Sequence, residues 1–367
     1  MVIIAQARNT IINIIYQGKD ITRDIAPYLL TFSFGDNAGG KADDLSLTLQ
    51  DVSGIWLTDW LPAKGDTITA SIITNDYPNT QTLPCGTFSV DQIDYSYPPS
   101  TFTIKAVSAS VKKQAVQQKH TRTWENVTLS EVLSELASEN GLTLEMYSFG
   151  DGRLEAIDQI EQSDLEFLQG LCADYGQTVK VQEGRLIVYD IAEYEGRGSA
   201  LTIERGDERL LSVRFTSKTA QVYRKSRVRY HDPVKDELYE AEYEDTDEEG
   251  SERELEICER VESQSDAERL AKQRLTSANR KEITGSITLK GDVRLSAGLT
   301  VELSGFGMFS GKHFINKATH KVDTSGYTTG LELGQPQAEK GKAKARKTSR
   351  KSKAVHPELF YEGEHVY

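Results

Sequence analysis

Short runs of β-branched and aromatic residues, separated by Gly, Asn, Asp and Pro, dominate the first third of the chain and limit what it can fold into. Within Gly86–Asp94 polar and apolar side chains alternate, so we expect one face of this segment in a core and the other in water. Short strands joined by such turn residues favour an antiparallel barrel or sandwich. The expected strands are Thr10–Tyr16, Tyr28–Phe34, Asp44–Leu49, Asp66–Thr74, Gly86–Tyr95 and Ser100–Ala106.

The next region adds helices to strands. Thr128 stands three residues before Glu131 and ahead of an apolar run, a spacing typical of a capping box at the start of an amphipathic helix. The same spacing returns at Ser163 and Glu166. We therefore expect two capped helices here, packed with strands in an α+β arrangement.

An alanine-rich helix is expected at Ser265–Arg280, because small and apolar side chains recur there at three- and four-residue intervals. Such a narrow stripe suits close packing on a sheet. Strands separated by glycines follow at Thr284–Leu289, Thr300–Leu303, His313–His320 and Thr328–Leu333. Their spacing predicts a second small antiparallel barrel.

The most acidic part of the chain lies just before that helix. Between Asp236 and Glu262 there are fourteen acidic residues and two basic ones. Strand-like runs at Glu237–Tyr243 and Arg253–Cys258, around an Asp-Glu-Glu-Gly turn, predict a hairpin. One interpretation is a solvated surface hairpin, because runs of like charge usually face water. The other is a surface that repels a passing polyanion.

The end of the chain differs in kind from the rest. Lysine and arginine dominate the segment after Gly334, with hardly any apolar side chain, which predicts a flexible tether. Apolar and aromatic residues then return at Leu359, Phe360 and Tyr361. We expect these three to be a docking peptide for a partner, since exposed apolar anchors need a partner surface. The alternative is that the tail has no ordered contact.

These patterns together predict an α+β fold that is mainly β. The expected parts are a first β-barrel domain over residues 1–110, an α+β domain over 111–200, a second β-barrel domain over 201–334 with the acidic hairpin 236–262 and the helix 265–280, and a basic tail over 335–367.

Charge and cysteine content exclude several classes of protein. A net charge of −13 argues against a chain that grips phosphate backbones over its whole surface. Cys85, Cys172 and Cys258 form no metal-ligand spacing, so we expect reduced core cysteines. No signal-like or membrane-spanning apolar run is present, and we expect no membrane insertion.

The sequence carries no pattern of known catalytic or metal chemistry. It has no nucleophile elbow, no zinc-protease helix and no phosphate loop followed by a helix. His313 and His320 are seven residues apart, so a regular strand would send them to opposite faces and prevent a shared metal. We expect no catalytic residue, no metal and no cofactor.

Three stretches in order resemble the phage late control D family, which includes the baseplate hub of T-even phages and the N-terminal part of type VI secretion VgrG proteins. They are Thr123–Leu129 with its helix, Gln162–Leu168 through Tyr175-Gly176 and Gly184–Leu186, and Ala267–Leu333. The resemblance implies a homotrimer in which each subunit supplies two related β-barrel tube domains around an α+β domain. Such a pseudo-hexameric ring would join a hexameric tail tube to a trimeric spike, as a structural hub that is not an enzyme.

The resemblance also implies partners and a place of assembly. Expected partners are the tail tube or its initiator, the spike protein and other baseplate components, with DNA at most passing through the channel. Channel-lining residues would then come from the acidic segment, with Asp245, Asp247, Glu248 and Glu249 as candidates, because like charge keeps a polyanion from sticking. The protein would be assembled in the bacterial cytoplasm and lie in the virion tail baseplate or in a tail-like particle.

Two rival functions stay open at this point. A cell-wall binding or hydrolysing tail-tip protein would use exposed aromatic residues, such as Tyr95, Tyr97 and Phe102, to stack on sugars. A cytosolic regulator is the other, although the acidic charge and the lack of a helix-turn-helix pattern weigh against it.

Overall fold

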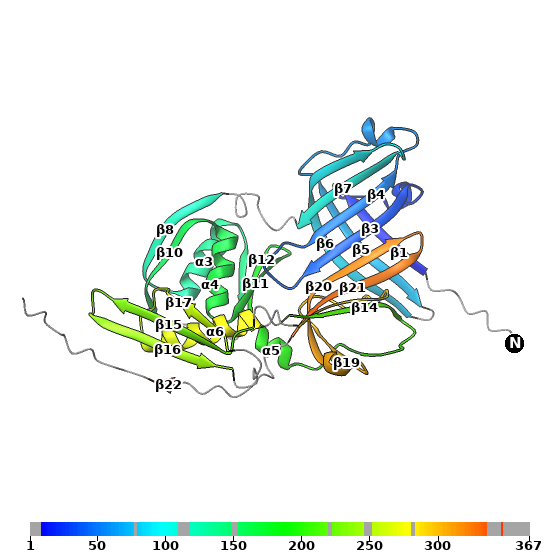
Figure 1. Cartoon of the computed structure of the whole chain (residues 1–367). Helices are drawn as coiled ribbons and strands as arrows, with labels where there is room; N and C mark the ends of the chain where they lie inside the picture. The colour runs from blue at the N-terminus through cyan, green and yellow to red at the C-terminus, as the bar shows by residue number, and fades with distance from the viewer. Residues whose placement is uncertain are drawn as a thin grey trace, which may run out of the picture.

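The chain forms two lobes in the computed structural model, which describes residues 9–76, 79–108, 118–147, 153–218, 222–245, 252–279, 283–335 and 346–347. We call them the sheet lobe and the α/β lobe (Figure 1). The sheet lobe contains residues 9–108, 201–217 and 283–335, and the α/β lobe contains residues 118–190 and 222–279. Up to Gln335 the chain therefore leaves the sheet lobe twice and returns to it twice, and β22 (Arg346–Lys347) lies again in the α/β lobe.

The first third of the chain is made of strands, and all six expected strands are present. They are β1 (Asn9–Tyr16), β3 (Leu29–Asn37), β4 (Asp44–Gln50), β5 (Thr67–Asp76), β6 (Asn79–Ser96) and β7 (Thr101–Ser108), with a short β2 (Lys19–Asp20) and the single turns α1 (Thr22–Ile25) and η1 (Ile55–Leu57). Alternating side chains such as Phe32 and Phe34, or Phe88 and Val90, fill one core. The period of two in the sequence therefore placed this core correctly.

The C-terminal strands continue the same sheet. These are β13 (Leu201–Glu204), β14 (Leu210–Ser217), β18 (Ile283–Lys290), β19 (Thr300–Ser304), β20 (Gly311–Asp323) and β21 (Gly326–Gly334), with the single turn η2 (Gly307–Phe309). β20 pairs antiparallel with β3, with His320 opposite Phe34, so both sets belong to one thirteen-stranded sheet. The main path runs from β14 to β2 without closing. The mainly-β fold is confirmed, whereas the described strands form an open sheet and no closed barrel.

The first part of the α/β lobe contains a pair of long antiparallel strands, β8 and β10, a three-stranded sheet and two helices. The elements of this part are β8 (Lys119–Thr128), α3 (Leu129–Glu139), β9 (Thr143–Met146), β10 (Arg153–Ser163), α4 (Asp164–Asp174), β11 (Gln177–Gln182) and β12 (Arg185–Asp190), and the short helix α5 (Ile191–Gly196) follows them. Both predicted capping boxes are confirmed, at Thr128 with Glu131 and at Ser163 with Glu166. Each one satisfies backbone N–H groups that the first helical turn leaves unpaired.

The second part of the α/β lobe is a small sheet covered by a helix. It contains β15 (Lys225–Asp232), β16 (Glu237–Glu244), β17 (Glu254–Ile257), α6 (Gln264–Asn279) and β22 (Arg346–Lys347). The expected acidic hairpin was wrong, because β16 and β17 do not pair with each other. Both pair with β15, which lies between them, antiparallel to β16 and parallel to β17. The basic side chains of β15 offset the repulsion that two adjacent acidic strands would feel.

Strand β20 departs from the expected regular geometry. Its pairing with β21 shifts between Ile315 and Lys317, which marks a bulge. An extra residue changes which side of the strand later residues face, so the argument that His313 and His320 point to opposite faces was wrong. Both are buried. None of the helices in the part of the chain that the structure describes is long and apolar enough to cross a membrane.

Candidate functional site

Of the residues predicted to line a channel or to dock a partner, the structure describes only Asp245. Asp245 is half-buried just after β16; its backbone N–H donates to Arg224 O at 2.8 Å and its Oδ2 accepts from Asn279 Nδ2 at 3.4 Å. Asp247, Glu248 and Glu249 lie outside the described residues, as do Leu359, Phe360 and Tyr361. The role of these residues stays a prediction.

A group of buried charges joins the two lobes. Lys180 on β11 places its Nζ 2.5 Å from Oδ1 of Asp36 on β3 and 3.9 Å from Oδ2 of Asp43. Both carboxylates are buried. The other oxygen of Asp36 accepts a hydrogen bond from Ala297 N at 2.8 Å. One carboxylate therefore ties together a strand of the first third, a strand of the α/β lobe and the loop before β19.

Close packing of the backbone at residues 38 and 39 adds to this contact between the lobes, which we call the joint. Tyr189 donates its hydroxyl to Ala38 O at 2.6 Å. A Cβ on Gly39 would lie 2.3 Å from Cγ2 of Thr178, so only glycine allows this contact. Burial raises the pKa of Asp43 to about 6, while Lys180 lowers it and Asp36 raises it. The joint therefore combines close packing of the two lobes with a buried ion pair between Lys180 and Asp36.

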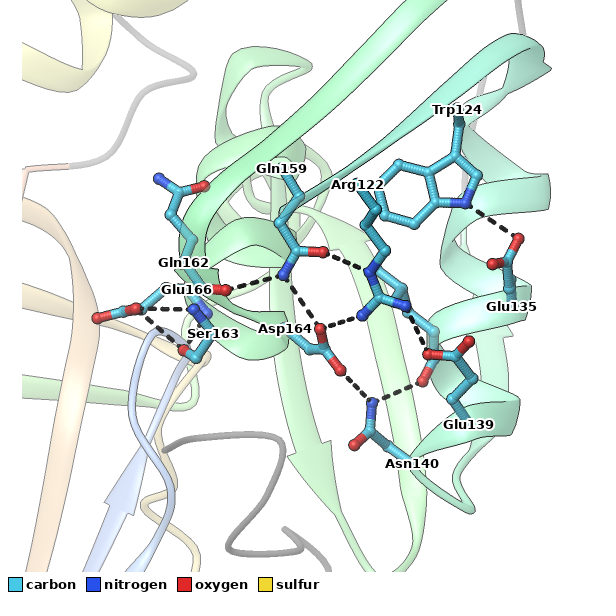
Figure 2. Close-up of polar contacts among 11 residues, drawn as sticks. Arg122, Trp124, Glu135, Glu139, Asn140, Gln159, Gln162, Ser163, Asp164 and Glu166 are labelled. Carbon is cyan, nitrogen blue, oxygen red and sulfur yellow. Dashed lines mark hydrogen bonds and ion pairs between the residues drawn. The ribbon is translucent and has the colours of Figure 1, made fainter. Parts of the chain in front are cut away.

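A second polar group lies inside the α/β lobe (Figure 2). Arg122 on β8 contacts Gln159 Oε1 at 2.8 Å, Glu139 Oε2 at 2.8 Å and Asp164 Oδ1 at 2.5 Å. Asn140 at the end of α3 donates to the other oxygen of Asp164 at 3.1 Å. These contacts join the end of α3 and the start of α4 to the paired strands β8 and β10.

The charge state of Asp164 shows what this group does. Burial by itself would raise the pKa of Asp164, but hydrogen bonds from Gln159, Asn140 and Arg122 outweigh it and lower the pKa. A carboxylate held ionised and fully hydrogen-bonded is a poor proton donor or acceptor near neutral pH. These residues therefore form a structural hydrogen-bond network that stabilises the α/β lobe.

The helix α6 is held against α4 by a comparable set of contacts. Arg269 donates to Asp174 O at 2.6 Å and stacks over the Tyr175 ring at 3.6 Å. Arg274 lies 2.9 Å from the Asp174 carboxylate. Glu262 accepts hydrogen bonds from the backbone N–H groups of Glu155 and Ala156. The acidic and helical segment is therefore an integral part of the α/β lobe.

An apolar surface with a cavity lies at one end of the β1–β7 strands. The cavity holds about 320 Å³ and is lined by Ile14, Ile25, Leu47, Trp56, Trp60 and Leu61, among others. Trp60 keeps 44% of its surface exposed and Leu61 54%, while Trp56 beneath them is buried. The rings of Trp56 and Trp60 pack edge to face at 5.2 Å. Exposed tryptophan over a preformed apolar pocket is typical of a protein–protein contact.

Sequence reasoning missed both this surface and the joint. Two tryptophans four residues apart in a predicted loop were the available signal for the surface. Nothing local marks Lys180, Asp36 or Asp43, because they come together only when the two lobes meet.

The aromatic residues of the wall-binding hypothesis do not form a shared platform. Phe102 is fully buried in the core, beside Trp56. Tyr95, near the end of β6, and Tyr97, on the turn to β7, are exposed, and the Tyr95 hydroxyl lies 3.1 Å from the Ser100 hydroxyl.

The expected chemistry of the cysteines is partly corrected. Burial raises the pKa of Cys172 to about 12 and raises that of Cys85 as well, so both are inert thiols. Cys258 is exposed, and its expected place in a core was wrong. Within the described ranges, no group of three or more His, Cys, Asp or Glu side chains could hold a metal ion.

Comparison with known proteins gives these features a context. A family model described as phage tail baseplate hub (GPD) matches residues 111–326. A probable baseplate hub protein of Escherichia phage 186 is 30% identical over 185 residues, which are 50% of this chain and 44% of that protein. The chain thus matches less than half the length of the curated relatives.

Solved structures share the fold over most of the chain. The 43 kDa tail protein of prophage MuSo2 from Shewanella oneidensis has a TM-score of 0.68 at 15% identity, covering 90% of this chain and 99% of that one. The Escherichia coli c3393 protein, a component of the type VI secretion system, has a TM-score of 0.51 at 11% identity, covering 83% of this chain and 73% of that one.

Proposed function

Because this chain belongs to the phage tail baseplate hub (GPD) family, we propose that it is the structural hub of a contractile phage tail or tail-like injection particle. The observation that carries the proposal is the family match over residues 111–326, which reaches from the α/β lobe into the sheet lobe. The likeness of fold over 90% of the chain to a prophage tail protein supports it. The chain would work in the tail baseplate after assembly in the host cytoplasm.

The hub would be a homotrimer that joins a hexameric tail tube to a trimeric spike. Support comes from the sheet lobe, in which the strands of residues 9–108 lie beside those of residues 201–217 and 283–334, and the two sets meet where β3 pairs with β20. Three subunits with two such segments each would offer six to the tube. The two segments would be the tube domains, residues 1–110 and the sheet-lobe strands of residues 201–334, around an α/β lobe that combines the α+β domain at 111–200 with residues 222–279.

Partner contacts would use the apolar surface around Trp60 and the terminal Leu359, Phe360 and Tyr361. Partners would be the tube or its initiator, the spike and other baseplate proteins. We propose no catalytic role for the chain and no cofactor. The wall-binding alternative gains no support, because one of its three aromatic residues is core and the family is a baseplate hub family.

Asp245, Asp247, Glu248 and Glu249 would line the channel and keep passing DNA from sticking. Changing all four to Asn or Gln tests this role. Slower DNA delivery from normally assembled particles is expected, and unchanged delivery would leave them as solvated surface residues.

Deleting the gene and complementing it with the intact chain tests the hub function itself. Without the chain, electron microscopy should show no sheathed tails with attached spikes, and complementation should restore them. Complete spiked tails in the deletion strain would rule out the hub function.

A further inference from the structure

The two sets of strands in the sheet lobe share one strand order. The first set, residues 9–108, runs β3-β4-β7-β6-β5-β1 across the sheet, and the second, residues 201–217 and 283–334, runs β14-β18-β21-β20-β19-β13. Numbered along the chain within each set, and with short β2 left aside, both orders read 2-3-6-5-4-1. Only the last strand differs in direction, because β1 is antiparallel to β5 whereas β13 is parallel to β19.

Bulges fall at corresponding places in the two sets. The second strand and the fifth strand of each set contain one bulge, which lies between Leu29 and Thr31 in β3, Leu210 and Ser212 in β14, Val90 and Gln92 in β6, and Ile315 and Lys317 in β20. Backbone hydrogen bonds to the segment before the fourth strand also match: Val90 donates to Asp66 and accepts from Gly65, and Ile315 donates to Leu299 and accepts from Gly298. The residues of these strands therefore correspond one to one.

Within the chain one junction joins the two sets. Past its bulge β20 no longer pairs with β19, and its residues 317–323 pair instead with residues 31–37 of β3, antiparallel. Figure 1 shows β20 beside β3 at this place. His320 is fully buried there and stacks on Phe34, with the ring centroids 6.0 Å apart. The fifth strand of one set is thus joined to the second strand of the other.

The counterparts of these two strands lie at open edges. Past its bulge β6 pairs with β7, and residues 92–96 have no strand partner on the β5 side in the part of the chain that the structure describes. Among the described strands β14 pairs with β18 alone. Tyr95, the counterpart of buried His320, is 45% exposed. Phe215, the counterpart of buried Phe34, is only half-buried. Surfaces that are covered at the junction are therefore uncovered at these two edges.

We propose that β14 of one copy pairs antiparallel with residues 92–96 of β6 in a second copy, and so repeats between copies the junction of β3 with β20. Six other strands separate β14 from β6 within one chain, so the partner is a second copy. Unpaired backbone groups of the two edges supply the hydrogen bonds. The register copies the observed one: Tyr95 falls opposite Phe215 as His320 lies opposite Phe34, and Ser96 falls opposite Arg214 as Lys321 lies opposite Ser33.

This contact is head to tail, because each copy offers one β6 edge and one β14 edge. Such a contact closes into a ring when the rotation between copies allows it. Junctions within chains then alternate with junctions between chains around the ring. The inference deepens the proposed homotrimer, and only the number of copies rests on that function.

Disulfide cross-linking of the full-length chain tests the junction between copies. Exposed Cys258 is first changed to Ser, and Ser96→Cys is then combined with Arg214→Cys, at two exposed side chains. Directly opposite residues of an antiparallel pair lie within the Cα separation that a disulfide needs. Mild oxidation should therefore link residue 96 of one copy to residue 214 of the next. The ladder of covalent products should end at three copies, and peptide mass mapping identifies the linked residues.

Two further pairs calibrate the result. Ser33→Cys with Lys321→Cys is the benchmark, because these residues lie opposite each other within one chain and should link there. Ser96→Cys with Lys218→Cys is the control, four residues out of register and about 13 Å away along the strand. A gap of that size cannot be bridged without backbone movement, so we expect the test pair to link about tenfold faster or more.

Equal rates for the test pair and the control pair would overturn the junction, as would a link between residues 96 and 214 of the same chain. Absence of the link between copies would also overturn it, whether light scattering shows a trimer or a monomer. A trimer without the link would leave the hub function standing, because deletion of the gene tests that function separately.

Discussion

Lys180 Nζ lies 2.5 Å from Oδ1 of Asp36, across the boundary between the α/β lobe and the sheet lobe. The same carboxylate also accepts the backbone N–H of Ala297, so three separate parts of the chain meet at one side chain. A contact of this kind holds the two lobes in one orientation.

Replacing Lys180 with Met should destabilise the protein strongly. The change keeps the length of the side chain but leaves Asp36 and Asp43 buried without their cation. Removing one partner of a buried ion pair costs about 3–5 kcal/mol, and we expect a loss of about 3 kcal/mol in the free energy of unfolding measured with urea.

Lys105→Met is the matched control for that experiment. Lys105 Nζ pairs with Asp94 at 2.9 Å, but both side chains are about half exposed. Surface pairs contribute about 0–1 kcal/mol, so this variant should stay within about 1 kcal/mol of the intact chain. Equal effects of the two substitutions would show that the joint is not a site of special stability.

Asp43→Asn should change how stability depends on pH. Burial raises the pKa of Asp43 to about 6, above the value of about 3.9 in an unfolded chain. Between these values the folded state holds a proton that the unfolded state has lost, so this group stabilises the fold at low pH. The contribution is lost as the pH rises from about 4 through about 6.

Asparagine keeps an acceptor for the Asn37 N–H and removes the titration. We therefore expect the free energy of unfolding to fall less between pH 4 and pH 6 in the variant. At pH 7 it should exceed that of the intact chain by up to about 3 kcal/mol. An unchanged slope would show that Asp43 titrates normally.

Gly39→Ala should loosen the joint by steric contact alone. Its Cβ would fall 2.3 Å from Thr178 Cγ2 and 3.0 Å from Val179 O, so the two lobes must move apart. Overpacking of this kind costs about 1–3 kcal/mol, measured by thermal or urea unfolding. Gly170→Ala within α4 has open space for its Cβ and should be neutral or stabilising by up to about 1 kcal/mol.

The sequence predicted local features well and long-range ones poorly. The capping boxes at Thr128 and Ser163 were recognisable because a helix start depends on four consecutive residues. The order of β17, β15 and β16 was not, because β17 follows β16 in the chain yet pairs with the far side of β15, and no local pattern marks that crossover. The bulge in β20 and the charge cluster at Lys180 depend likewise on contacts between distant segments.

Trp60→Ser should impair incorporation into particles more than it impairs folding. Trp60 is half-exposed above an apolar cavity, so its removal costs the fold little and costs an interface an aromatic anchor. We expect an unfolding free energy within about 1 kcal/mol of the intact chain, with a large loss of complete particles counted by electron microscopy. Tyr97→Ser, at a side chain 76% exposed and away from the cavity lining, is the control and should assemble normally. Normal assembly of the Trp60 variant would remove this surface from the partner contacts.

The trimeric hub is the central claim, and the solution mass of the purified chain tests it most directly. Light scattering should be measured on the chain alone and after mixing with the spike protein of the same particle. The account predicts a species near three times 40.9 kDa that gains mass when the spike is added. A monomer whose mass is unaffected by the spike would contradict it.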